Sequence, residues 1–173
     1  MIGRWRKPAL AGAMSLATLA GATTFIGGWE GMRTEAYRDI VGVWTVCYGE
    51  TRGVGPGDRH TKAECDAMLG QGIRQFEAAL LRCLPERGTA AADSYAEMPP
   101  GMKIAVVSWS YNVGTGAACG STLARRVREG NLEAACEQLP RWNRAGGRVV
   151  RGLTNRRGAE RALCLTALKE ELS

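Results

Sequence analysis

Residues 29–45 read WEGMRTEAYRDIVGVWT, a stretch that passes from acidic residues directly into a β-rich run. Glu30 stands first, on what we expect to be a short helical turn, and Asp39 follows among Tyr, Val, Ile, Trp and Thr. Because glycines interrupt residues 35–54, this run predicts two or three short strands joined by tight turns. The stretch therefore predicts a small β-lobe that begins directly after a helix end carrying a carboxyl group.

Helices are predicted to follow this lobe. Thr61-Lys62-Ala63-Glu64 is a capping-box pattern, which opens a helix that we expect to reach about Cys83. A second helix begins at Pro99-Pro100, and since it is apolar nearly all round it should lie buried at the centre. Further helices are expected at residues 121–130, 131–139 and 154–170.

The predicted fold class is α+β, with a small N-terminal β-lobe, a larger helical lobe and a cleft between them. The 173 residues contain no internal repeat or low-complexity tract, and this length can bury a sizeable core. We therefore expect one domain over residues 29–173, preceded by an N-terminal export or anchor helix.

The N-terminal segment, residues 1–28, has the features of an export signal. Arg4, Arg6 and Lys7 precede an uncharged run over residues 9–28, long enough to span a bilayer core, and their charge favours a cytoplasmic N-terminus. The run holds six Ala, four Gly and four Ser or Thr, so membrane residence should be marginal. A cleavable signal peptide ending near Ala20-Gly21-Ala22 is the alternative to the uncleaved, weakly held segment that we expect.

The cysteine pattern favours disulfides. The six cysteines show no C-x-x-C spacing and His60 is the only histidine, so no zinc site is expected. Export would place them in an oxidising compartment, which favours disulfides over six buried thiols. Spacing cannot fix the pairing, and we choose the one that joins the hairpin to the next helix, brackets the buried helix and ties two late helices: Cys47–Cys65, Cys83–Cys119 and Cys136–Cys164.

Positive charge gathers near the C-terminus. The chain carries a formal charge of +6, and residues 141–161 contain seven arginines against the single acid Glu160. We interpret this cluster as a solvated basic face that favours anionic wall and envelope surfaces. Nucleic acid is not an expected partner, since no helix-turn-helix, zinc or RNA-binding signature accompanies the charge.

The spacing of Glu30, Asp39 and Thr45 fits glycoside hydrolysis. Eight residues separate the glutamate from the aspartate, and five separate the aspartate from the threonine. One protonated carboxyl can donate to the leaving oxygen while an ionised one orients water, at roughly 6.5–9.5 Å for an inverting enzyme. A hydroxyl can hold that water. Exposed surface carboxylates remain the alternative, because most Glu and Asp pairs are surface groups.

Three segments resemble one known family in the right order. WEGMRTEAYRDIVGVWTVCYGET, residues 29–51, is similar to the active-site segment of phage-type lysozymes, the muramidase family of glycoside hydrolases. WSYNVGTGAACGSTLARRV and LPRWNRAGGRVVRGLTNRRGAERALC resemble the helical lobe of the same family, so the resemblance spans about residues 29–164. With the weak N-terminal segment, the whole resembles the signal-arrest-release endolysins of phages that infect Gram-negative bacteria.

This resemblance assigns roles to five residues. It implies that Glu30 is the general acid, that Asp39 orients the attacking water and that Thr45 is the second partner of that water. It further implies that Arg157 pairs with the catalytic glutamate and that Asn112 lines the cleft, where plain helix-surface and helix-capping roles are the alternatives.

The resemblance also implies an activity and a location. The expected reaction is hydrolysis of the β-1,4 bond between N-acetylmuramic acid and N-acetylglucosamine in peptidoglycan, which lyses the host, by a monomer without metal or organic cofactor. A lytic transglycosylase and a non-catalytic wall- or membrane-binding module are the alternatives. Residues 9–28 would tether the exported protein to the inner membrane before its release into the periplasm. Glu50 stands where many relatives carry histidine, and its role is left open.

Overall fold

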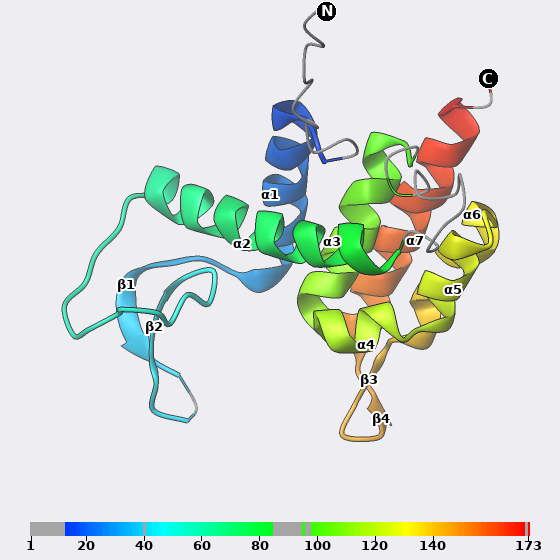
Figure 1. Cartoon of the computed structure of the whole chain (residues 1–173). Coiled ribbons are helices and arrows are strands. Elements are labelled where there is room, and N and C mark those ends of the chain that lie inside the picture. Colours follow the sequence, from blue (N-terminus) through cyan, green and yellow to red (C-terminus); the bar gives the residue numbers. More distant parts are fainter. Residues whose placement is uncertain (1–12, 40, 85–94, 96–97, 172) are drawn as a thin grey trace, which may run out of the picture.

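The computed structural model describes residues 13–39, 41–84, 95, 98–171 and 173, which form a two-stranded hairpin and a larger helical body (Figure 1). The strands are β1 (Arg33–Arg38), β2 (Trp44–Cys47), β3 (Arg144–Ala145) and β4 (Arg148–Val149). The helices are α1 (Leu16–Glu30), α2 (Lys62–Cys83), α3 (Pro100–Val113), α4 (Thr115–Cys119), α5 (Thr122–Arg128), α6 (Leu132–Cys136), the short 3-10 helix η2 (Leu139–Arg141) and α7 (Arg151–Glu171). The α+β class predicted from the sequence is confirmed.

The β-lobe is built on the antiparallel pair β1–β2. Arg33 lies opposite Cys47 and Tyr37 lies opposite Thr45, with an irregularity in the register between them. Val46 and Cys47 are buried beside Cys65 at the start of α2. The lobe therefore packs against the first turns of α2, and Figure 1 shows the two strands below this end of the helix.

Helix α2 leads from the β-lobe to the helical body. The predicted capping box is present, since Thr61 accepts a hydrogen bond from the Glu64 N–H and the Glu64 carboxylate accepts one from the Thr61 N–H. The helix ends at Cys83, as predicted. A capped helix of this length gives the two lobes a common rigid element.

Helix α3 is the centre of the body. It packs against α1, α2 and α7, and consecutive residues from Ala105 to Ser110 are buried. Trp109 is fully buried and meets Trp142 edge to face at 5.3 Å between ring centroids. The prediction of a helix buried on nearly all sides is confirmed.

Helix α1 lies within the body and carries Glu30 as its last residue. Ser15 caps its first turn, and Thr18, Ala22 and Ile26 form a buried stripe at four-residue spacing. Small residues permit a close approach, because a Cβ on Gly21 would lie 3.1 Å from Ile104 Cδ1. The expected short helical turn at Glu30 is thus the end of a continuous helix. Within the described part of the chain, no helix is both long and apolar enough to cross a membrane.

The last helix begins earlier than predicted, at Arg151 rather than at Thr154. The Val150 N–H donates to the Asn143 carbonyl and closes the β3–β4 hairpin, while the Thr154 N–H already donates to the Val150 carbonyl. Thr154 therefore lies inside the first turn, where its hydroxyl also bonds the Val150 carbonyl instead of capping the helix. The expected end near residue 170 agrees with the observed end at Glu171.

The three disulfides are those chosen from the sequence. Cys47–Cys65 joins β2 to α2, Cys83–Cys119 joins α2 to α4, and Cys136–Cys164 joins α6 to α7. Each bridge connects two neighbouring elements and closes a long loop, the arrangement in which cross-linking restricts the unfolded chain.

Packing between α3 and α7 yields a stability prediction. A Cβ on Gly101 would lie 2.8 Å from Ala167 Cβ, so Gly101→Ala should lower the free energy of unfolding by about 1–3 kcal/mol. Gly158→Ala is the matched control, since a Cβ at this exposed position of α7 meets nothing and alanine favours the helix by roughly 0.5–1 kcal/mol. Urea unfolding should shift the two midpoints in opposite directions. Equal shifts would contradict the packing.

Candidate active site

Glu30 meets Arg156 where the C-terminal end of α1 approaches α7. The Arg156 Nη1 donates to Glu30 Oε1 at 2.8 Å, and the Arg156 side chain is 5% exposed while that of Glu30 is 23% exposed. Glu30 Oε2 makes no hydrogen bond to the residues that the structure describes. Gly31 then adopts a φ of +72°, which ends α1 and turns the chain into β1. A partly exposed carboxyl is thus held at one oxygen and open at the other.

A buried charge cluster supports this contact. Glu160, fully buried, accepts hydrogen bonds at Oε1 from the Ser108 hydroxyl at 2.7 Å, from Arg156 Nε at 3.2 Å and from Arg157 Nη2 at 3.0 Å. Arg156 also donates to the Ser108 carbonyl at 3.2 Å. The carboxylates of Glu30 and Glu160 therefore balance the charges of Arg156 and Arg157. These contacts hold the Arg156 guanidinium against α3.

Burial governs the electrostatics of the cluster. It raises the pKa of the Glu160 carboxyl above its ordinary value, against the opposing charge of Arg157, the Ser108 hydrogen bond and the charge of Arg156. It also lowers the pKa of Arg157 to about 10, although Glu160 acts in the other direction. Both directions have one cause, since desolvation disfavours a charge of either sign.

The arginine that contacts Glu30 is Arg156, one residue before the predicted Arg157. Arg157 is fully buried and forms an ion pair with Glu160, with Nε and Oε2 at 2.8 Å. Adjacent residues of a helix point about 100° apart, so only one of two neighbouring arginines can face α1. Arg157 still acts on the site electrostatically, because the charge of Glu30 is among those that affect its pKa.

Asp39 and Thr45 belong to the β1–β2 hairpin. Asp39 Oδ1 accepts hydrogen bonds from the Val41 and Val43 N–H groups at 2.9 and 2.8 Å, and so shapes the turn. Thr45 is 4% exposed, and its hydroxyl donates to the Val43 carbonyl at 3.1 Å. Among the described residues no hydrogen bond or ion pair joins either side chain to Glu30.

Tyr111 is a site residue that spacing did not single out. It lines the same pocket as Glu50, and burial raises its pKa, with the carboxylates of Glu30 and Glu50 acting in the same direction. Its ring also packs on Phe76 at 4.9 Å between centroids. Asn112, predicted to line the cleft, is exposed on the next position of α3. The only sequence signal for Tyr111 was its place in the quoted SYNVG run.

Glu50 lies in a pocket between the β-lobe and α2. The pocket has a volume of about 120 Å³ and is lined by Glu50, Arg52, Gln75 and Tyr111 among others. Glu50 accepts from Arg52 Nε at 3.1 Å, and this bond lowers the pKa of Glu50. The role of Glu50 was left open by the sequence, and in the structure this acid pairs with Arg52. No cluster of three or more His, Cys, Asp or Glu side chains suited to a metal occurs in the described ranges.

The fold and this acidic site define a lysozyme-like glycoside hydrolase. Residues 27–160 match the phage lysozyme family, and the chain belongs to that family. It is a phage-type endolysin, and its substrate class is peptidoglycan.

Similar proteins of known name support this assignment. The SAR-endolysin of Bacteriophage PS119 is 39% identical over 143 residues, covering 80% of this chain and 77% of its own length. The SAR-endolysin of Pseudomonas phage phiKMV is 36% identical over 163 residues, covering 92% of each. The crystal structure of the active form of the P1 phage endolysin Lyz superposes with a TM-score of 0.70 at 31% identity, over 85% of this chain and 84% of that one.

The buried cluster predicts unequal effects of two arginine substitutions. Arg157→Met should lower the free energy of unfolding by about 3–5 kcal/mol, because it leaves Glu160 buried with less compensating charge. Arg161→Met removes an ion pair with Glu137 that is 41% and 44% exposed, so its effect should stay below about 1 kcal/mol. Urea denaturation measures both. A similar loss from the two variants would contradict a structural role for the cluster.

Proposed function

We propose that this endolysin cleaves the β-1,4 bond between N-acetylmuramic acid and N-acetylglucosamine with inversion, using Glu30, Asp39 and Thr45. Glu30 would donate a proton to the leaving oxygen, Asp39 would orient the attacking water, and the Thr45 hydroxyl would be the second partner of that water. The observation that carries the proposal is the position of Glu30, partly exposed at the helix end from which the chain runs directly into the hairpin that bears the other two residues.

The contacts of each side chain are compatible with these roles. Arg156 holds one oxygen of Glu30, which leaves Oε2 available to a glycosidic oxygen. The turn uses Oδ1 of Asp39, so Oδ2 is available to water. Thr45 now donates to the Val43 carbonyl, and a hydroxyl can accept from water while it donates elsewhere.

A lytic transglycosylase and a non-catalytic wall-binding module are the competing functions. A transglycosylase needs one acid only, and the presence of Asp39 and Thr45 at the hydrolase spacing argues against it. Mass spectrometry of the products separates these enzymes, because only the transglycosylase yields anhydro-sugar ends. Proton NMR of a short glycan substrate then reports the anomer formed first, which tests inversion.

The proton-donor role predicts that Glu30→Gln keeps the fold and lowers turbidity-based lysis of purified peptidoglycan by about 10²–10⁴-fold. Glu35→Gln is the matched control, because this side chain in the same segment is 65% exposed and pairs with Arg59. Full activity in a folded Glu30→Gln protein would refute the assignment, and circular dichroism of both variants checks the fold.

The hairpin residues call for substitutions that spare the turn. Asp39→Asn removes the charge and retains an oxygen that can accept from the Val41 and Val43 N–H groups, so the turn should be kept. We expect a severe loss of kcat, because the attacking water would lose its charged partner. Thr45→Val should cause a smaller loss, since it removes the hydroxyl and keeps the β-branched shape. Wild-type kcat in Asp39→Asn would exclude the water-orienting role.

We further propose that residues 1–28 act as a signal-arrest-release segment, which tethers the exported protein to the inner membrane and leaves it for the periplasm. The names of the relatives and the weak apolar character of residues 9–28 support this. The described end of this segment forms most of α1 in the body, so tethering and docking are alternative states of the same residues. Glu30 takes its place only in the docked state.

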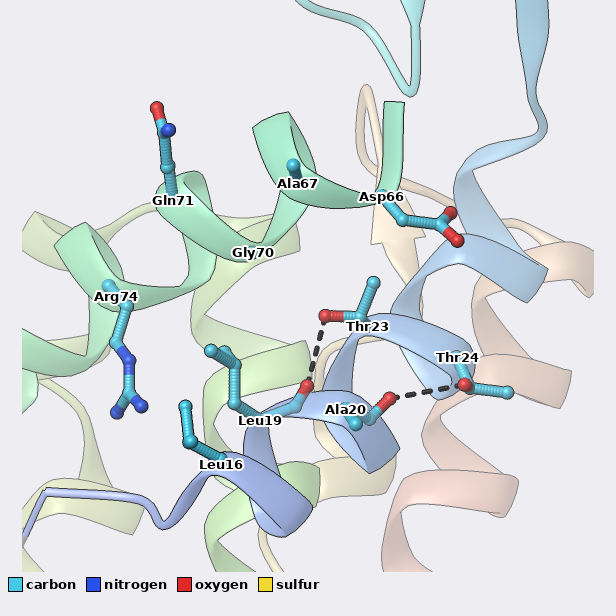
Figure 2. Close-up of a pocket in the computed structure, with 10 residues that line it drawn as sticks. All are labelled: Leu16, Leu19, Ala20, Thr23, Thr24, Asp66, Ala67, Gly70, Gln71 and Arg74. Carbon is cyan, nitrogen blue, oxygen red and sulfur yellow. Dashed lines mark hydrogen bonds between the residues drawn. The ribbon is translucent and has the colours of Figure 1, made fainter. Parts of the chain in front are cut away.

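Tethering can be strengthened at positions that are exposed in the docked state. Ala17, Ala20 and Thr24 point to solvent on α1, and Figure 2 shows the last two beside the groove between α1 and α2. Replacing all three with Leu favours the bilayer by several tenths of a kcal/mol each, so the variant should stay in the membrane fraction and lyse later. Gln at the same positions is the control and should hasten release. A membrane-bound Leu variant that lyses at the wild-type time would disprove restraint by tethering.

A further inference from the structure

Two side chains of α2 bind the backbone just before α1. Glu77 Oε1 accepts a hydrogen bond from the Met14 N–H, and Arg74 Nη1 donates to the Met14 carbonyl at 2.8 Å. Arg74 also pairs with Glu77 Oε2 at 2.8 Å. The two bonds to the Met14 backbone, here called the Met14 contact, join residues that are 60 or more positions apart in the chain.

The Met14 contact is buried, which makes it selective. Met14 is 3% exposed and Glu77 is 2% exposed, and the Tyr95 hydroxyl donates a further hydrogen bond to Glu77 Oε1 at 3.4 Å. A buried carboxylate is costly without partners, so Glu77 is satisfied fully only when the Met14 N–H is present. The docked position of α1 therefore lowers the free energy of a charge that belongs to α2.

The contact acts at the opposite end of α1 from Glu30. Arg156 holds the C-terminal end of the helix, and Arg74 with Glu77 holds the backbone next to Ser15, the N-cap. Figure 2 shows Arg74 reaching from α2 toward the first turn of α1, beside Leu16 and Leu19. A rigid helix held at both ends cannot slide along its axis, so the Met14 contact also determines where Glu30 lies.

We propose that Arg74 and Glu77 are positioning residues that select the docked state of α1 over its membrane-inserted state, and so place Glu30 for catalysis. This inference rests on the proposed release from the membrane. Their hydrogen bonds to the N-terminal segment go to backbone atoms of Met14, so they recognise that the segment has arrived in the correct register and not the side chain of residue 14. In the membrane-inserted state the Met14 N–H and carbonyl are not available to them.

The test measures docking without requiring activity. Purified full-length wild type, Glu77→Ala and Arg74→Gln are incubated with vesicles of phosphatidylethanolamine and phosphatidylglycerol, and the bound fraction is measured by flotation. Loss of a hydrogen bond to a charged group should shift the partition toward the vesicles by about tenfold or more. Hydrogen exchange in solution should accelerate in α1 and remain unchanged in α3 and α7.

Lys62→Ala is the control, since it breaks an exposed ion pair on the same helix and should match wild type in both measurements. Wild-type vesicle binding and α1 exchange in Glu77→Ala would overturn the proposal, as would equal acceleration in α1, α3 and α7. If Glu77→Ala fails to fold, Arg74→Gln decides alone, because Arg74 is 34% exposed. Lysis of peptidoglycan by the wild-type protein is assayed in parallel, and this assay tests the proposed activity independently of docking.

Discussion

The ion pair between Glu30 and Arg156 connects the first described helix to the last, and the arrangement of the helical body follows from it. Arg156 can meet Glu30 only because Glu160 and Ser108 hold its guanidinium against α3. Glu30 can meet Arg156 only if α1 packs against α2 and α3, so that its last residue reaches α7. A contact across 126 positions of sequence thus reports that both ends of the fold are assembled.

The composition of helix α1 suits both the packed body in water and the proposed short residence in a bilayer. Its buried stripe of Thr18, Ala22 and Ile26 and its close approach at Gly21 suit tight helix packing in water. The same small residues give a segment with little gain from a bilayer. Larger apolar residues on this face would improve insertion and would at the same time clash with α3. Weak hydrophobicity is therefore a requirement of the packed fold as well as of the proposed release.

The sequence predicted the features that depend on local chemistry. The capping box at Thr61 and the buried helix that begins at Pro100 follow from residue type and order, whereas the disulfide pairing was a choice among possible pairings that the structure confirms. The predicted start of α7 was wrong by three residues, because the β3–β4 hairpin determines where the helix begins. The predicted partner of Glu30 was wrong by one residue, because neighbouring helix positions point about 100° apart and the sequence does not show which of them faces α1. The Met14 contact left no signal in the sequence, since arginine and glutamate are common on helices and only the tertiary fold brings Arg74 and Glu77 to the Met14 backbone. The catalytic roles of Glu30, Asp39 and Thr45 stay predictions.

All three disulfides join cysteines between residues 47 and 164, and α1 contains none. Oxidation of the exported chain therefore makes no demand on the position of α1. A tethered molecule can complete its covalent maturation while its acid is still absent from the site. In the proposed release, what then separates it from the active enzyme is a reversible docking step, so a pool of finished molecules would accumulate and be released together, on a timescale set by helix transfer and not by thiol chemistry.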